Sequence, residues 1–322
     1  MMINKWKMPT TMTMILLFLI TCTVIIMSII RFGYAYPDSS YYLDMVEFFS
    51  GTLSGLELTA PFCYRPMLPL IVALLPLEAE ISFAIINLIF LILISWVIFY
   101  MSLKRDSNPL VALLTTLVFI VSLLYLFYGA VVLVDPGAIF FLSLAYYYLR
   151  EEGRNMQITI LLTLGVLFKE VALVGVATYI LLRNFKEWWL MVFPVGTYTI
   201  LRIITPSGNP GYIWSFHLDN LVMNGVATLK TFLFGMTPFL ILIILAYLHW
   251  RSSKTHESTD RKWILAAGIP ALTYLFLGLF FAHFDVRFFW PIYLMLVPLC
   301  TDGFSEFFRL IRFSLPSESA ME

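Results

Sequence analysis

Residues 156–182 read MQITILLTLGVLFKEVALVGVATYILL, an apolar stretch whose only charged residues are Lys169 and Glu170. A helix that crosses the hydrocarbon of a bilayer needs roughly 20 mostly apolar residues. The stretch is therefore compatible with two structures. It can form one long tilted span with Lys169 at mid-bilayer, or two short helices, 156–168 and 171–182, that meet at Lys169 and Glu170.

The distribution of basic residues distinguishes these two structures. With a hairpin of two short helices, one side of the membrane carries 14 of the 20 basic residues and the other side keeps six. With one span, every later loop changes side and the split becomes about nine to ten, so the positive-inside rule favours the hairpin with both termini in the cytoplasm. Each arm is about 20 Å long at 1.5 Å per residue. The hairpin tip therefore lies below the far membrane surface, where irregular backbone must be buried in protein or line a wet cavity.

The composition also indicates a polytopic membrane protein. Of the 322 residues, 61% are hydrophobic and 12% are charged, whereas a soluble domain has about 45–50% apolar and about 25% charged residues. This excludes a soluble enzyme, a disordered protein and a nucleic-acid-binding protein, which would show a basic face. The three cysteines are widely separated and form neither a disulfide framework nor a metal-ligand spacing.

Eight further apolar runs predict the remaining spans, at 11–30, 81–103, 109–128, 134–149, 188–204, 230–250, 263–282 and 288–308. Together with the two short, re-entrant-like hairpin arms they predict an all-α fold of about ten hydrophobic helices. We expect one transmembrane domain over residues 1–312 and a short cytoplasmic tail over 313–322. The first run is longer than the apolar region of a usual signal peptide, so we expect it to remain as a span. Two long loops, 31–80 and 205–229, then lie on the outer side.

The outer side carries six basic residues, several of them inside or against apolar sequence, and all fall near the outer leaflet boundary. A charge at the centre of a membrane helix costs about 2.5–3.5 kcal/mol, so such residues usually face a cavity or a partner. This shared depth is the main functional signal in the sequence. The six residues are Arg31, Arg65, Lys169, Arg202, Lys230 and Arg287.

The first outer loop contains Tyr36–Tyr42 (YPDSSYY), in which Asp38 follows Pro37. The segment that follows has apolar residues at the i, i+3, i+4 and i+7 spacing, which predicts an amphipathic helix along the membrane surface. Asp38 can be the N-cap of that helix or a functional carboxylate, and the two roles are compatible. The apolar positions are Tyr42, Met45, Val46 and Phe49.

Two other charged residues precede apolar segments on the same side. Arg65 lies in Phe62–Pro69 (FCYRPMLP), where it can bind a phosphate through two hydrogen bonds or form a salt bridge at the interface. Asp135 precedes Pro136 at the expected start of a helix. This order is a strong N-cap signature, so Asp135 can be structural or can take part in substrate binding.

The remaining candidates lie at two tight connections. Lys169 and Glu170 are adjacent and point apart, so each needs a partner elsewhere or a ligand. A turn of a few residues before the last span contains His283, Asp285 and Arg287. Arg287 can reach an anionic ligand from the mouth of that span, or pair locally with Asp285.

In this order and on one side of the membrane, these segments resemble the GT-C integral-membrane glycosyltransferases. That group contains the protein O-mannosyltransferases and the lipid A aminoarabinose transferases. The likeness covers roughly residues 10–310, and one departure is Ser39, which stands where protein O-mannosyltransferases have the second residue of an acidic pair. The segments that carry the likeness are Pro37–Tyr42, Tyr64–Pro69, Asp135-Pro136, Phe168–Glu170 and Arg287 leading into Trp290-Pro291.

The resemblance implies a helical bundle with an outward-facing cavity that amphipathic loop helices cover. It also implies transfer of a sugar from a polyprenyl-phosphate donor to an acceptor hydroxyl. That hydroxyl needs a general base, and the departing lipid phosphate needs fixed cations. We expect Asp38 to be the base. The expected substrate-binding residues are Arg65, Lys169 and Arg287 as phosphate binders, Arg202 as a weaker one, and Asp135, Glu170 and His283.

The expected partners are a lipid-linked sugar donor, membrane lipids and a glycan, lipid or protein acceptor. No cofactor is predicted, because Asp38 with Asp44 or Asp135 does not have the spacing of a metal-ligand motif. We expect a multi-pass protein of a prokaryotic plasma membrane with its site facing outward. A transporter or lipid-handling protein and a non-catalytic membrane scaffold are the alternatives, and inversion or retention at the anomeric carbon stays open.

Overall fold

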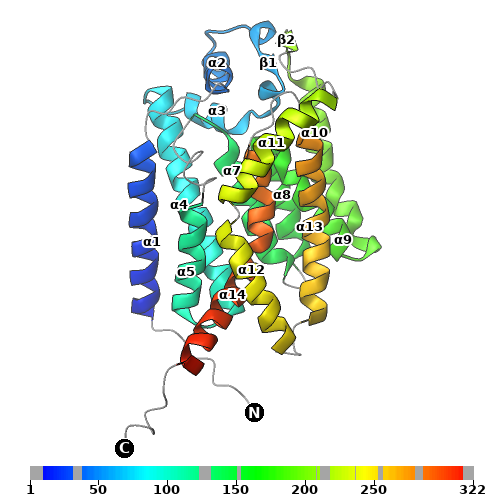
Figure 1. Cartoon of the computed structure of the whole chain (residues 1–322). Helices are drawn as coiled ribbons and strands as arrows, with labels where there is room; N and C mark the ends of the chain where they lie inside the picture. The colour runs from blue at the N-terminus through cyan, green and yellow to red at the C-terminus, as the bar shows by residue number, and fades with distance from the viewer. Residues whose placement is uncertain are drawn as a thin grey trace, which may run out of the picture.

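The computed structural model describes residues 10–31, 38–122, 132–150, 154–207, 209–210, 218–235, 237–252, 257–279 and 286–314. These parts of the chain are almost entirely helical (Figure 1), which confirms an all-α fold. The first elements are α1 (Thr10–Arg31), α2 (Ser39–Phe49), η1 (Gly55–Glu57), β1 (Thr59–Ala60), η2 (Phe62–Tyr64), α3 (Met67–Ala73), α4 (Ala79–Arg105), α5 (Pro109–Ile120) and α7 (Asp135–Leu149). They are followed by α8 (Asn155–Phe168), η3 (Glu170–Ala172), α9 (Leu173–Leu182), η4 (Phe185–Met191), α10 (Val192–Ile204), β2 (Asn209–Pro210), α11 (Leu218–Gly235), α12 (Thr237–Ser252), α13 (Glu257–Leu279), η5 (Val286–Phe289) and α14 (Trp290–Ser314).

Four stretches of helix in the described residues are long and apolar enough to cross a membrane. They are Thr10–Ile30, Ala79–Arg105, Arg261–Leu279 and Arg287–Ile311. Shorter apolar helices accompany them at Pro109–Ile120, Asn155–Phe168, Glu170–Leu182 and Phe239–Arg251. These helices suit a membrane-embedded protein, while the number of ten hydrophobic helices stays a prediction.

The hairpin that the sequence predicts at 156–182 is present. Helix α8 ends at Phe168, and Lys169 is extended with φ −165° and ψ 148° before η3 and α9 begin. The two arms pack closely because small residues face the partner arm. A Cβ on Gly165 would lie 2.9 Å from the Ala172 Cβ, and one on Gly175 would lie 2.4 Å from Leu162. The stretch is therefore a broken helix pair and not one long span.

The predicted span over 230–250 and the predicted loop over 205–229 are both wrong in part. Helix α11 begins at Leu218, inside that loop, and ends at Gly235, so α12 supplies only the later part of the expected span. Pro238 lies in the first turn of α12, where its missing N–H would have no helical partner anyway. The run predicted over 109–128 forms α5 to Ile120, and residues 123–131 lie outside the described residues.

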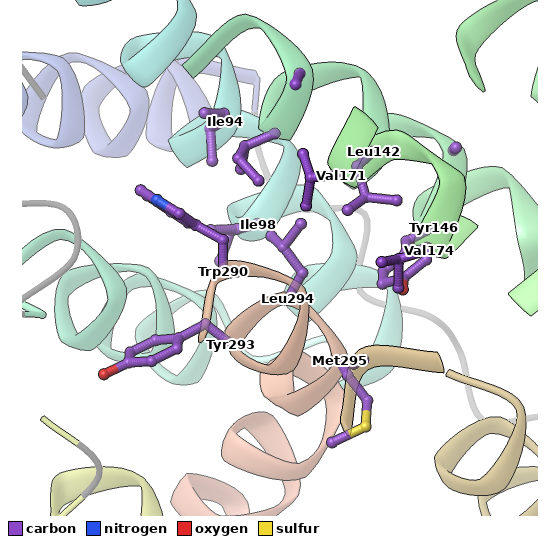
Figure 2. Packing of buried hydrophobic residues seen from close by; sticks show 14 of the residues in the cluster. Ile94, Ile98, Leu142, Tyr146, Val171, Val174, Trp290, Tyr293, Leu294 and Met295 are labelled. Carbon is purple, nitrogen blue, oxygen red and sulfur yellow. The ribbon is translucent and has the colours of Figure 1, made fainter. Parts of the chain in front are cut away.

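Helix α14 lies at the centre of the hydrophobic core. From Phe289 to Gly303 every side chain of this segment is buried, as expected for a helix that is apolar on all sides. Figure 2 shows its residues Trp290 and Leu294 beside apolar residues of α4 and α7. Helix α1 is its opposite: most of its apolar side chains are exposed, which suits a surface that faces lipid.

The loop helices gather at one end of the bundle, which we call the α2 end. Figure 1 shows α2, α3 and β1 together there, and the C-terminal end of α14 at the opposite end. Helix α2 buries Tyr42, Met45 and Val46, which confirms the predicted amphipathic helix. Strand β1 pairs with β2 in parallel register, Thr59 with Asn209 and Ala60 with Pro210. This short pairing joins the two long loops of the sequence and was not predicted.

Candidate functional site

Six charged residues from distant parts of the chain meet in one ion-pair network at the α2 end. They come from the start of α2, the segment before α3, the start of α7, the hairpin tip and η5. Each is a candidate that the sequence singled out, and the structure brings all six together, while their role in substrate binding stays a prediction. We call this set the charged network: Asp38, Arg65, Asp135, Lys169, Glu170 and Arg287.

Lys169 and Asp135 form the most buried pair of the network. Lys169 Nζ lies 2.6 Å from Asp135 Oδ1, and only 3% of the Asp135 side chain is exposed. The expected N-cap role of Asp135 is wrong, because Val134 is the N-cap of α7 and no side chain caps this helix. Asp135 is instead the first helical residue, and its carboxylate faces the extended Lys169 at the hairpin tip. The break in the α8–α9 pair thus places the lysine on a carboxylate of α7.

Arg287 extends the network from Asp135 to Asp38. Its Nη1 lies 3.5 Å from Asp135 Oδ2, and its Nη2 lies 2.6 Å from Asp38 Oδ2. Asp38 occupies the N-cap position of α2 but makes no side-chain capping hydrogen bond. Its position agrees with the capping interpretation, but its carboxylate contacts Arg287 and does not cap the helix. Asp285, the alternative partner that the sequence offered for Arg287, lies outside the described residues.

Arg65 and Glu170 form the second arm of the network. Arg65 Nε and Nη2 donate to the two Glu170 oxygens at 3.0 and 2.6 Å, a planar two-point contact. Arg65 Nη1 also donates to the Tyr42 hydroxyl oxygen at 2.6 Å. Because Glu170 follows Lys169 directly, the hairpin tip contributes Lys169 to the pair with Asp135 and Glu170 to the pair with Arg65. The expectation that both residues need partners elsewhere in the chain is confirmed.

Tyr42 contacts this site, although the sequence predicted no role for its side chain beyond the apolar face of its helix. Burial raises the pKa of the Tyr42 hydroxyl above its ordinary value, and the neighbouring Arg65 partly opposes this. The phenol therefore stays neutral at physiological pH and accepts the hydrogen bond from Arg65. A tyrosine beside charged residues in a loop was the available signal, but the same residue also fits the apolar spacing of α2.

Arg202 takes part in none of the ion pairs of the charged network. Its guanidinium carbon is 4.7 Å from the centre of the Tyr64 ring and 4.7 Å from the centre of the Tyr198 ring. Such stacking over aromatic faces is a common environment for arginine. No carboxylate of the described residues forms a salt bridge with Arg202. His283, the other remaining candidate, lies outside the described residues, as does the side chain of Arg31.

Two other features of the described residues bear on ligand binding. No group of three or more His, Cys, Asp or Glu side chains in them is arranged to hold a metal ion. A hollow of about 360 Å³ lies between α2 and the start of α4, and no residue of the charged network lines it. Its lining residues are Leu43, Val46, Glu47, Glu78, Ala79 and Glu80.

A second ion-pair cluster lies at the opposite end and was not predicted. Asp302 of α14 accepts from Arg105 Nε and Nη2 at 2.8 and 2.7 Å, and from Trp250 Nε1 at 2.8 Å. One helical turn later, Glu306 is 1% exposed and contacts His249 and Arg309. Two acids four residues apart, at the end of an apolar run, were the signal for this cluster.

The charged network holds three cations, three carboxylates and a neutral phenol at one end of a helical bundle. Such a set can bind an anionic group through its cations and can move a proton through a carboxylate. It joins five segments that are far apart in the sequence, so it depends on the whole fold. No protein-family model, no curated protein and no solved structure matches this chain.

Proposed function

We propose that this chain is a membrane glycosyltransferase of the GT-C type, which moves a sugar from a polyprenyl-phosphate donor to an acceptor hydroxyl. The observation that supports this proposal is the charged network. It combines a candidate base, Asp38, with the cations Arg65, Lys169 and Arg287 at one end of an apolar bundle. A lipid-linked donor requires this combination, because its tail stays in hydrocarbon while its phosphate and sugar reach the interface.

The proposed reaction uses Asp38 as the general base. The acceptor oxygen forms a bond to the anomeric carbon as its proton moves to the Asp38 carboxylate. The bond between the anomeric carbon and the phosphate oxygen breaks, and its electron pair leaves with the lipid phosphate. Network cations stabilise the additional negative charge on that phosphate. Direct displacement by one acceptor inverts the configuration at the anomeric carbon.

We place the α2 end on the outer side of a prokaryotic plasma membrane, with both termini in the cytoplasm. The excess of Lys and Arg in the opposite segments supports this orientation. Lipid-exposed helices such as α10, whose Ile203 and Ile204 are 75% and 67% exposed, offer an apolar path for the donor tail. Arg202 lies on the same helix beside Tyr64, where it can meet a phosphate at the membrane boundary.

A transporter or lipid-handling protein is the second candidate, and the broken α8–α9 pair favours it. Interrupted helices with charges at the break are typical of transporter binding sites. Transporters usually carry a matching interruption in a second, related half, and the sequence has no internal repeat. A non-catalytic scaffold would use the same ion pairs for stability alone.

Transfer in proteoliposomes separates these candidates. We expect the purified chain to move a labelled sugar from a lipid-linked donor to a water-soluble or lipid acceptor, with release of lipid phosphate. Movement of the intact donor between leaflets without release of lipid phosphate would instead identify a transporter. If a panel of donors with different sugars and chain lengths shows no transfer and no movement, the proposed enzyme is refuted and the non-catalytic scaffold remains.

A further inference from the structure

We propose that the donor phosphate replaces Asp38 on Arg287, so that donor binding itself releases the general base. This inference rests on the proposed function and adds a binding order to it: donor first, acceptor activation second. It also assigns the phosphate to one cation of the three. Arg287 receives the phosphate, whereas Arg65 and Lys169 hold the hairpin tip in place.

The charged network contains equal numbers of positive and negative side chains. Three cations face three carboxylates, so the six side chains are neutral as a set. A neutral, mutually paired set attracts an anion far less than free cations do, since each cation is already compensated. A phosphate therefore gains a strong contact only by displacing a carboxylate. The network is a closed arrangement that an anion has to open.

The ion pairs of the charged network differ in how accessible their cations are. Arg287 is 12% exposed, against 7% for Arg65 and 8% for Lys169, so it is the most accessible network cation. Arg65 is held on three sides by both oxygens of Glu170 and by Tyr42. The partner of Lys169, Asp135, is the most buried carboxylate of the set. The contact between Arg287 and Asp38 is thus the one that an incoming phosphate can reach.

Asp38 is the carboxylate that the phosphate would displace from Arg287. Asp38 Oδ2 lies 2.6 Å from Arg287 Nη2, so this oxygen is occupied by a cation in the closed arrangement. This contact holds the carboxylate against Arg287, whereas general-base catalysis needs a carboxylate oxygen within hydrogen-bond distance of the acceptor hydroxyl. When a phosphate holds Arg287, Asp38 is free for the hydroxyl. When the product lipid phosphate leaves, Asp38 returns its proton to water and pairs with Arg287 again.

Binding of farnesyl phosphate to the full chain in detergent, measured by isothermal titration calorimetry, tests the exchange without any sugar. Wild type, Asp38→Asn, Arg287→Gln and the double variant form a double-mutant cycle. We expect Asp38→Asn to bind on the order of tenfold more tightly, because the Asp38 carboxylate no longer competes for Arg287, although Asp135 still lies 3.5 Å from Arg287 Nη1. Arg287→Gln should bind at least about tenfold more weakly, and the double variant should bind like Arg287→Gln alone.

Several outcomes of this cycle would overturn the exchange. One is that Asp38→Asn binds farnesyl phosphate no more tightly than wild type does. Another is that Asp38→Asn still raises this affinity when Arg287 is replaced by Gln. Glu47→Gln removes an exposed negative charge from the same helix, and an equal gain there would indicate a general field effect and overturn the exchange. Thermal unfolding verifies that each variant is folded, and Asp38→Ser replaces Asp38→Asn in the cycle if the asparagine variant is not.

Two further ligands identify the recognised group. If Asp38→Asn raises the affinity for farnesyl phosphate alone, the ligand is a lipid-linked phosphate. If it raises the affinity for inorganic phosphate as well, the site recognises phosphate in general. An equal gain with farnesol, which has no charge, would overturn the exchange. If the exchange holds but proteoliposomes show no transfer, only the proposed function fails. If transfer occurs and Asp38→Asn does not alter phosphate binding, only this inference fails.

Discussion

At the residue scale, Arg65 illustrates how a candidate ligand-binding residue can instead hold a site together. The sequence offered Arg65 as a phosphate binder or a salt-bridged residue. In the structure its guanidinium spans both oxygens of Glu170 and the Tyr42 hydroxyl. Removing one partner of a buried ion pair leaves an uncompensated charge and costs about 3–5 kcal/mol. Arg65 therefore contributes first to the stability of the α2 end.

We predict that Arg65→Met lowers the thermal unfolding temperature in detergent strongly, because Glu170, whose side chain is only 16% exposed, then loses the arginine that neutralises it. The double variant Arg65→Met/Glu170→Leu should recover most of the loss, since apolar side chains of similar volume replace a buried pair at little cost. Differential scanning fluorimetry at a fixed scan rate measures both. An unchanged Arg65→Met variant would show that the pair contributes nothing to stability.

We predict that Asp38→Asn abolishes sugar transfer while the protein stays folded and binds lipid phosphate. Loss of a general base lowers the rate by about 10²- to 10⁴-fold, which initial rates in proteoliposomes would detect. Glu47→Gln on the same helix is the control, and it should retain transfer. Normal turnover by Asp38→Asn would remove Asp38 from the mechanism.

The sequence located the charged residues that meet at the α2 end better than it predicted what each of them contacts. The depth of Asp38, Asp135 and Arg287 near the outer boundary follows from their place relative to apolar runs. Their mutual contacts do not follow from it. Arg287 is 249 positions from Asp38 and 152 positions from Asp135, so these residues meet only after the bundle has packed. Neither aspartate caps its helix through its side chain. A local pattern could not show this, because a distant basic residue contacts each carboxylate: Arg287 contacts Asp38, and Lys169 contacts Asp135.

At the element scale, the hairpin was predictable and the helix α11 was not. Charge distribution along the whole chain decided that 156–182 is a broken pair, and the extended Lys169 agrees. Helix α11 mixes apolar and polar residues over Leu218–Gly235, so its start lacks the continuous apolar run that marks a span. A polar helix beside a bundle depends on tertiary contacts such as Asn224 Nδ2 with Leu279 O, 2.8 Å apart.

We predict that Gly137→Ala destabilises the protein and reduces transfer. A Cβ at this position would lie 2.2 Å from Phe168 Cδ1, and overpacking of this kind costs about 1–3 kcal/mol. Because Phe168 precedes Lys169, its displacement also moves the lysine away from Asp135. Thermal unfolding and initial transfer rates measure the two effects.

Gly196→Ala on α10 is the matched control for that substitution. Nothing lies within 4 Å of a Cβ at this position, and a helical Gly is less favourable than Ala by about 0.5–1 kcal/mol. We expect this variant to be equally or slightly more stable and to retain transfer. Equal losses in both glycine variants would contradict close packing of α7 against the hairpin.

At the scale of the whole molecule, two ion-pair clusters mark the two ends of the bundle. The charged network lies at the α2 end, and the cluster of Asp302 and Glu306 lies where α4 ends at Arg105. Arg287, just before α14, and Asp302, within α14, are 15 residues apart, so the two clusters lie about 22 Å apart along this helix at 1.5 Å per residue. That is shorter than the hydrocarbon core of about 30 Å, in agreement with a charged network that lies below the membrane surface.

We predict that the two ends lie on opposite sides of the membrane. Thr52, just after α2, and Ser107, just after α4, are both exposed. In a background with Cys22, Cys63 and Cys300 replaced by alanine, a membrane-impermeant maleimide should label Thr52→Cys in intact cells. It should label Ser107→Cys only after permeabilisation. Labelling of both in intact cells would contradict the orientation.

The account depends most on the charged network being the binding site of a lipid phosphate. A cryo-electron microscopy structure of the protein in nanodiscs with bound polyprenyl phosphate tests this directly. We predict phosphate density within hydrogen-bond distance of Arg287, with Asp38 turned away from that arginine. Phosphate density at the Asp302 and Glu306 end, or at the α2 end with the pair of Arg287 and Asp38 intact, would contradict the account.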